Sequence, residues 1–116
     1  MEPREIPAEQ WVGFIADFNR DHTGETVRIE VVDEEIGRQF VADGLPLMGI
    51  SFDTRGTRPS SIEIAAGDLP SGLVRHVVDL PLAISIETDL RNHDIGLKIE
   101  PAQGPVTLLL LEGAVH

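Results

Sequence analysis

The chain has 116 residues, of which 20 are acidic and 9 are basic, so its formal net charge is −11 at pH 7. Nucleic-acid binding depends on lysines and arginines that neutralise phosphates, and excess acid also disfavours an anionic membrane surface, so neither partner is expected. The chain has no cysteine, which excludes disulfides, thiolate nucleophiles, zinc fingers and iron–sulfur clusters.

Length and composition predict one folded domain over residues 1–116, located in the cytoplasm. Hydrophobic residues make up 41% of the chain and charged residues 25%, which is ordinary for a globular protein. The first five residues lack the apolar core of a secretory signal. The longest leucine run, Leu108 to Leu111, is too short to span a bilayer.

An amphipathic helix is predicted over residues 7–20. Pro7 suits the first helical position, because the N–H that proline lacks has no partner there. The i, i+3, i+4, i+7 spacing that marks one helical face is occupied by Trp11, Phe14, Ile15 and Phe18. These large side chains bury much area, so we expect the helix to be the main apolar plug against a sheet.

The sequence period changes to two after this helix, and residues 26–112 are predicted to be β-rich. Val27, Ile29 and Val31 alternate with charged residues, as in a half-buried strand. Further short strands are predicted at 38–42, 46–53, 61–65, 73–78, 82–88, 96–100 and 106–111.

The strand predicted at 46–53 contains a glycine. Met48, Ile50 and Phe52 are expected to share one face of it, and Gly49 indicates a bend or bulge. Many short strands divided by glycine and proline favour an α+β, mainly β fold. We expect the N-terminal helix to pack on a small, strongly curved antiparallel sheet or an SH3-like or Sm-like barrel of about six to eight strands.

Several short motifs are spread along the chain: Ile6-Pro7 with Trp11 and Phe14, Glu35-Ile36-Gly37, Leu45-Pro46-Leu47 with Gly49-Ile50-Ser51, His76, and Gly104 with Thr107-Leu108-Leu109. As a set they resemble a family of short bacterial proteins catalogued as a domain of unknown function. The resemblance covers the chain from about Ile6 to Leu111. It implies a bacterial origin and a stand-alone domain, and it supplies no activity and no site residues.

No catalytic residue is predicted. Ser71, His76 and Asp79 occur in close order, but a strand directs His76 and Asp79 to opposite faces, whereas a catalytic triad needs them in contact. His76 is therefore expected either as a partly buried histidine between Val74 and Val78 or as a polar contact in a pocket.

Three polar loops can each be explained by an ordinary structural role or by a more specific functional one. The loop with Asp89 and Asp94 does not follow the EF-hand spacing, so it predicts a turn and no metal ligand. The acidic run 33–35 predicts a solvated turn or an acidic docking surface. Arg55 and Arg58 can bind an anion or a partner carboxylate, or simply keep a hairpin tip soluble.

The last predicted strand, 106–111, is apolar on both faces, so both faces must be covered. The helix can cover one side of the sheet, and a barrel interior or a second subunit must cover the other. Leu109 and Leu111 are the predicted contact of a homodimer. A central strand within one subunit is the alternative.

These observations predict a non-enzymatic binding or protein-interaction module that self-associates as a homodimer, accepts a possible protein partner and needs no cofactor. The alternative is a small-ligand or metal-binding barrel domain that uses the barrel mouth, with His76 as a polar contact. An enzyme ranks last, since an active site can also assemble from residues distant in sequence.

Overall fold

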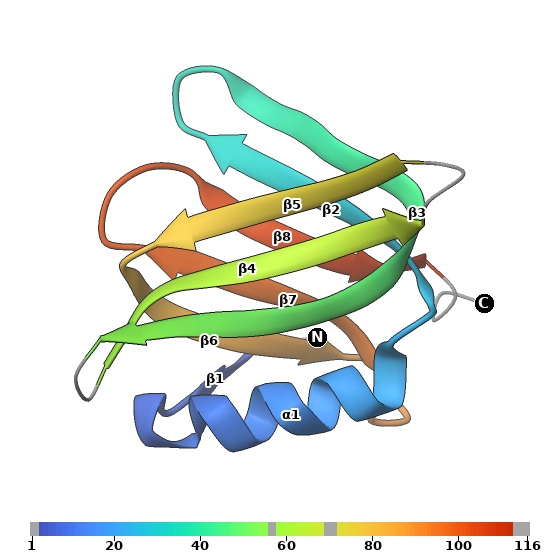
Figure 1. Cartoon of the computed structure of the whole chain (residues 1–116), viewed down its shortest axis with the longest axis horizontal. Coiled ribbons are helices and arrows are strands. Elements are labelled where there is room, and N and C mark those ends of the chain that lie inside the picture. The colour runs from blue at the N-terminus through green and yellow to red at the C-terminus, as the bar shows by residue number, and fades with distance from the viewer. Residues whose placement is uncertain (1–2, 56–57, 69–71, 113–116) are drawn as a thin grey trace.

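A computed structural model of the chain describes residues 3–55, 58–68 and 72–112, apart from the side chains of residues 54, 55, 58 and 59. These residues form one α-helix and an eight-stranded antiparallel sheet (Figure 1). The helix is α1 (Trp11–His22) and the strands are β1 (Arg4–Ile6), β2 (Thr26–Asp33), β3 (Gly37–Arg55), β4 (Arg58–Asp68), β5 (Gly72–Asp79), β6 (Pro81–Thr88), β7 (Asp94–Pro101) and β8 (Val106–Leu111).

The helix begins slightly later than residues 7–20 predict and presents the expected face. A single 3-10 turn (Ala8–Gln10) precedes α1, and the indole Nε1 of Trp11 donates a hydrogen bond to the carbonyl oxygen of Ile6 at 2.8 Å. The predicted stripe is turned inward: Trp11, Ile15 and Phe18 are buried, and Phe14 packs against them. No helix in the described ranges has the length and apolar character needed to cross a bilayer.

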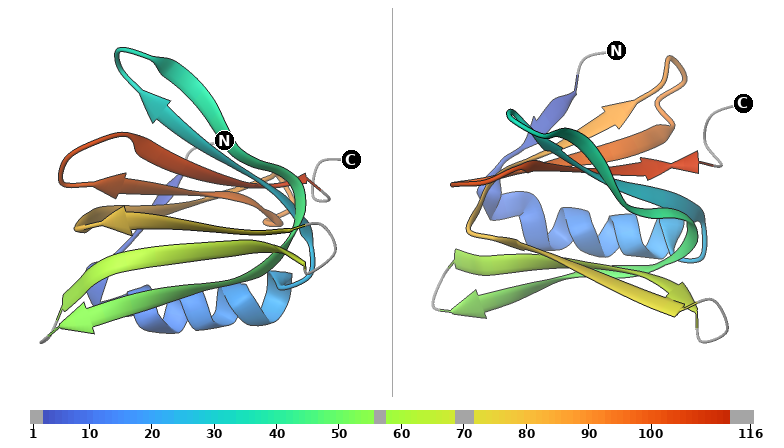
Figure 2. Two further views of the ribbon diagram at one scale, coloured as in Figure 1. Left: turned by 45° about the horizontal axis from the view of Figure 1, so that its top comes forward. Right: turned by 90° about the horizontal axis from the view of Figure 1, so that it is seen from above.

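The sheet folds over on itself because β3 belongs to two layers. In the order β1-β6-β7-β8-β2-β3-β4-β5, the first part of β3 pairs with β2 and the second part with β4 (Figures 1 and 2). Helix α1 lies along one side of this arrangement (Figure 2). The end strands β1 and β5 each have one neighbour, so the sheet is strongly curved and open rather than a closed barrel.

Bulges explain where the predicted strands differ from the observed ones. The strands expected at 38–42 and 46–53 are one strand, since the residues between them form a bulge in which Asp43 pairs with Arg28 and Leu45 with Val27. Another bulge lies between Leu47 and Gly49, where the register against β4 shifts and the φ of Gly49 is +154°, and it reverses the inward–outward alternation. Met48 is consequently 48% exposed rather than sharing the buried face of Ile50.

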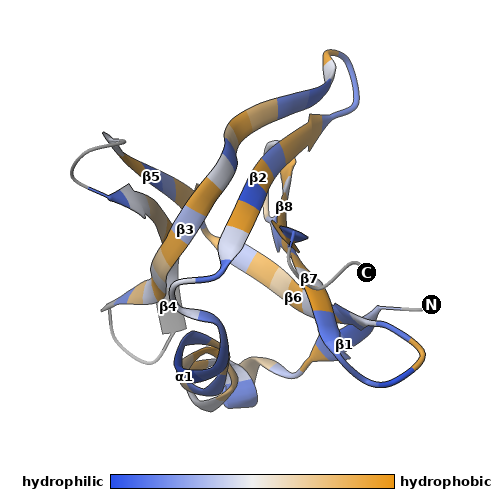
Figure 3. Cartoon of the chain, turned by 90° about the vertical axis from the view of Figure 1, so that its right-hand side faces the viewer, coloured by the Kyte–Doolittle hydropathy of each residue, from blue (hydrophilic) through white to orange (hydrophobic). Residues whose placement is uncertain are grey.

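The core lies between the two layers and α1, and hydrophobic residues alternate with hydrophilic ones along β2 and β3 (Figure 3). Leu109 and Leu111 of β8 belong to this core, with 0% of either residue exposed. This corrects their assignment to a homodimer contact, because side chains without exposed area offer no surface to a second copy. The face of β8 that is partly exposed carries Leu108 and Leu110.

Candidate functional site

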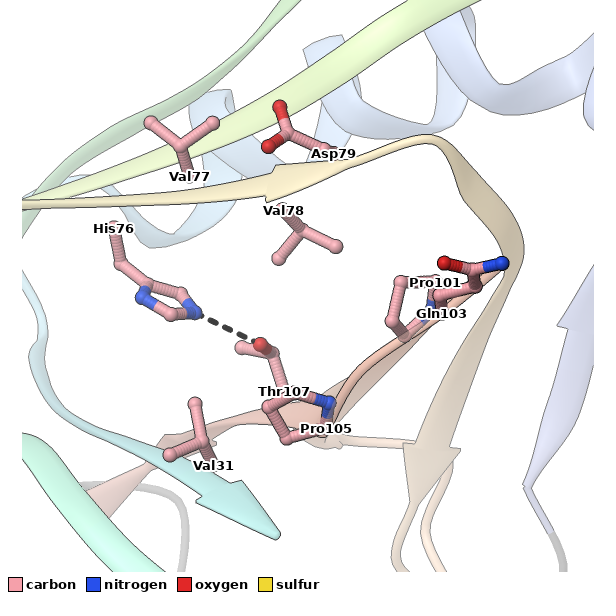
Figure 4. A pocket seen from close by; sticks show the side chains of 9 residues that line it. All are labelled: Val31, His76, Val77, Val78, Asp79, Pro101, Gln103, Pro105 and Thr107. Atoms are coloured by element: carbon pink, nitrogen blue, oxygen red, sulfur yellow. Dashed lines mark hydrogen bonds between the residues drawn. The ribbon is translucent and has the colours of Figure 1, made fainter. Parts of the chain in front are cut away.

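A cavity of about 190 Å³ lies between β5 and the facing layer of the sheet (Figure 4). Its lining comes from β2, β5, the end of β7, the following turn and β8: Val31, His76, Val77, Val78, Asp79, Pro101, Gln103, Pro105 and Thr107. Valine and proline side chains make most of the wall. A hydroxyl, an amide and an imidazole supply hydrogen-bonding groups.

His76 is the polar side chain that β5 directs into this cavity. Its Nε2 lies 2.8 Å from the hydroxyl oxygen of the buried Thr107. Burial lowers the pKa of His76 below its usual 6.5, so the imidazole is neutral at pH 7. Val77 and Asp79 point to the opposite side of β5, as strand alternation requires, and no His–Asp pair forms (Figure 4). Ser71 lies outside the described residues.

The second feature of the site is the free edge of β5. The backbone N–H of Leu80 donates to the carbonyl oxygen of Ser60 at 2.9 Å. This bond shows which residue pairs of the β4–β5 ladder are the hydrogen-bonded ones. Hydrogen-bonded pairs alternate in an antiparallel ladder, so His76 and Val78 direct their backbone groups toward β4. The backbone groups of Leu73, Arg75, Val77 and Asp79 therefore point away from β4, along the open edge.

This edge carries few of the features that usually protect an edge strand against further pairing. Natural sheets guard edge strands with charged residues, above all lysine, and with proline or bulges. β5 contains no lysine or proline and pairs with β4 without a register shift, and its charged residues are Arg75 and Asp79. Val77 is 49% exposed on its outer face. Val77 and Asp79 also line the cavity, although their side chains point to the other side of β5 (Figure 4).

The other predicted candidates take part in turns or lie outside the described residues. The side chains of Arg55 and Arg58 are outside them. Asp89 Oδ1 accepts hydrogen bonds from the backbone N–H groups of Arg91 and His93, at 2.8 and 2.9 Å, and these bonds lower the pKa of its carboxyl. Asp33 Oδ1 caps its own acidic turn in the same way. Within the described ranges no three histidine, aspartate or glutamate side chains converge as metal ligands.

His22 forms an ionic cluster with two carboxylates that the sequence did not predict. Its Nδ1 lies 2.7 Å from Glu25 Oε2, and its Nε2 lies 2.8 Å from Asp94 Oδ2. Each nitrogen faces a carboxylate, and both nitrogens can donate only in the imidazolium, so these contacts favour the protonated ring. Glu25 at i+3 was a visible signal in the sequence, but Asp94 is 72 positions away. The cluster ties the end of α1 to the start of β7.

Glu30 forms a second ionic cluster, on the outer face of β2. Its side chain is only 2% exposed, with its carboxylate 3.1 Å from Arg28 Nε and 2.9 Å from Arg38 Nε. The guanidinium of Arg28 also lies over the ring of Phe40, 5.6 Å from its centroid. These contacts link β2 to β3 and give the cluster a structural role.

A model of the family of unknown function DUF5335 matches residues 2–114. The chain belongs to this family. This DUF5335 chain is also 36% identical over 55 residues to an uncharacterised protein of Aquifex aeolicus (strain VF5), an alignment that covers 47% of the chain and 50% of that protein. The chain thus spans about half the length of the curated relative it matches. No solved structure matches. The match confirms the resemblance to a bacterial family of unknown function that the motifs indicate.

Proposed function

We propose that this DUF5335 domain is a non-enzymatic protein-interaction module that receives an extended segment along the open edge of β5. The supporting observation is the hydrogen-bonding pattern of the β4–β5 ladder, in which the backbone groups of Arg75, Val77 and Asp79 point away from β4 and meet no other strand among the described residues. Adding a strand to such an edge is a recurring mode of peptide recognition.

The cavity behind β5 supplies selectivity in this proposal. In strand addition, backbone hydrogen bonds give affinity, and alternate side chains of the added segment enter pockets. The cavity walls are formed largely by valine and proline, beside the neutral imidazole of His76. An uncharged, apolar side chain of modest size suits this lining, because a charged group would lose its hydration without gaining an opposite charge.

The test removes one outward N–H from the edge and keeps the ladder to β4. In Val77→Pro this N–H is lost, and proline is tolerated at edge positions that face away from the neighbouring strand. We expect random peptides displayed on phage to be enriched on the wild type and to bind Val77→Pro about tenfold more weakly. Val77→Thr keeps the N–H and serves as the matched control. Enrichment of no peptide, or equal binding by Val77→Pro, contradicts the proposal.

A small-molecule ligand in the same cavity is the second candidate function. The observation that favours it is His76, a neutral, half-buried ring that a ligand hydroxyl or carbonyl can reach once it replaces Thr107 as the hydrogen-bond partner. A fragment library screened by NMR should then shift the amide signals of Val31, His76 and Thr107 together. Hits that leave these three signals unmoved would argue against this candidate.

A further inference from the structure

We infer that the segment received by β5 is the β5 of a second copy of this chain, so that two sheets join edge to edge about a two-fold axis. This inference rests on the proposed function and adds the identity of the partner. Its basis is the order of side chains on the outer face of β5, where Arg75, Val77 and Asp79 follow one another on alternate residues.

This order of side chains is complementary in charge to the same order read in the opposite direction. Two-fold symmetry requires antiparallel pairing of the two edges, in which the same residues face each other from both sides. With Val77 opposite Val77 of the partner subunit, Arg75 lies opposite Asp79 of the partner subunit, and the reciprocal pair forms as well. Directly opposed opposite charges stabilise a sheet, whereas like charges destabilise it.

Neighbouring registers lose this complementarity. The hydrogen bonds across the junction must join residues whose backbone groups point outward on both strands. The two-fold axis can therefore move along β5 only in steps of one whole residue. An axis at His76 sets Asp79 against Leu73 of the partner subunit, and an axis at Arg75 sets two arginines against each other. The register centred on Val77 is therefore selected by charge.

The side chains concerned are free to make these contacts. Val77 is 49% exposed, and Asp79 is exposed. Arg75 Nη1 lies 3.7 Å from Glu63 Oε1, a loose contact at the surface, since 70% of the Arg75 side chain is exposed. Arg75 can thus bridge Glu63 and a carboxylate of the partner. A chain with a net charge of −11 repels its copies, so complementary pairs at the junction are needed to offset that repulsion.

The inner face of the junction brings the two cavities together. In the register centred on Val77, His76 faces Val78 of the partner subunit. Both residues line the cavity of their own chain. The joined sheet therefore places two copies of the cavity side by side across the axis.

The test is the oligomeric state of the full chain, measured by sedimentation equilibrium over a wide concentration range. We expect the wild type to dimerise, and Arg75→Asp or Asp79→Arg alone to weaken the dimer by about tenfold or more, because each variant sets like charges against each other at two places. An equimolar mixture of the two variants should restore the dimer, since each substituted residue then meets an opposite charge. That rescue also demonstrates that both variants are folded.

Arg91→Asp and Glu34→Arg are the matched controls, because they change the net charge equally at exposed positions away from β5. Both should dimerise like the wild type. A wild type that stays monomeric, or a dimer that neither β5 variant weakens, overturns the inference. Peptide binding that depends on the N–H of Val77 would still support the proposed function if the wild type were monomeric, so the two failures are distinguishable.

Discussion

Single side chains supply backbone partners where two elements meet in this molecule. The amide of Asn19 on α1 donates from Nδ2 to the carbonyl oxygen of Ile50 and accepts at Oδ1 from the N–H of Ile50, both at 2.8 Å. It satisfies the backbone of β3 directly after the bulge at Gly49. The amide therefore supplies the donor and the acceptor that a neighbouring strand would otherwise supply, and it holds the helix against the sheet.

His22 makes a comparable link by charge, and the link is predicted to depend on pH. Burial opposes the charged ring, but hydrogen bonds to Asp94 and Glu25 outweigh it and raise the pKa of His22 above its usual 6.5. A raised folded pKa stabilises the fold fully below pH 6.5, and this stabilisation is lost as the pH rises through the folded value. Urea unfolding of the wild type and His22→Gln should give stability differences that shrink above pH 6.5. A pH-independent difference would contradict the imidazolium assignment.

Substituting two glycines by alanine is predicted to change stability in opposite directions. Gly13 lies within α1, and a Cβ there meets nothing within 4 Å, so Gly13→Ala should stabilise the domain by about 0.5–1 kcal/mol. Gly67, at the end of β4, has a φ of +113°, and a Cβ there overlaps the carbonyl oxygen of Gly72. Gly67→Ala should cost about 2 kcal/mol or more. Urea unfolding measures both changes, and effects of equal sign would refute the assigned backbone geometry.

For whole helices and strands, the sequence predicts those whose hydrophobic residues repeat with a regular local period. The helix and the strands near 61–65, 73–78, 82–88, 96–100 and 106–111 follow from the change between a period of 3.6 and a period of two. β1 was missed because three residues carry no measurable period. The continuity of β3 was missed because a bulge forms only against a partner strand, and the sequence does not name that partner.

The arrangement of the whole molecule depends on contacts between distant positions. His76 and Thr107 are 31 positions apart, and His22 and Asp94 are 72 apart, so neither contact follows from spacing. Alternation did separate His76 from Asp79 (Figure 4). The need to cover both faces of β8 identified Leu109 and Leu111 as important, but only the strand order places them in the core and leaves β5 with an open edge.

The most direct measurement on that edge is amide hydrogen exchange along β5, read residue by residue by NMR in dilute and concentrated solution. We expect the amides of Arg75, Val77 and Asp79 to exchange rapidly when dilute and to become protected on concentration. Those of His76 and Val78, which bond to β4, should be protected in both. A Val77 amide as protected as that of Val78 in dilute solution would mean that the edge is already covered within one chain, and would contradict the proposed binding surface.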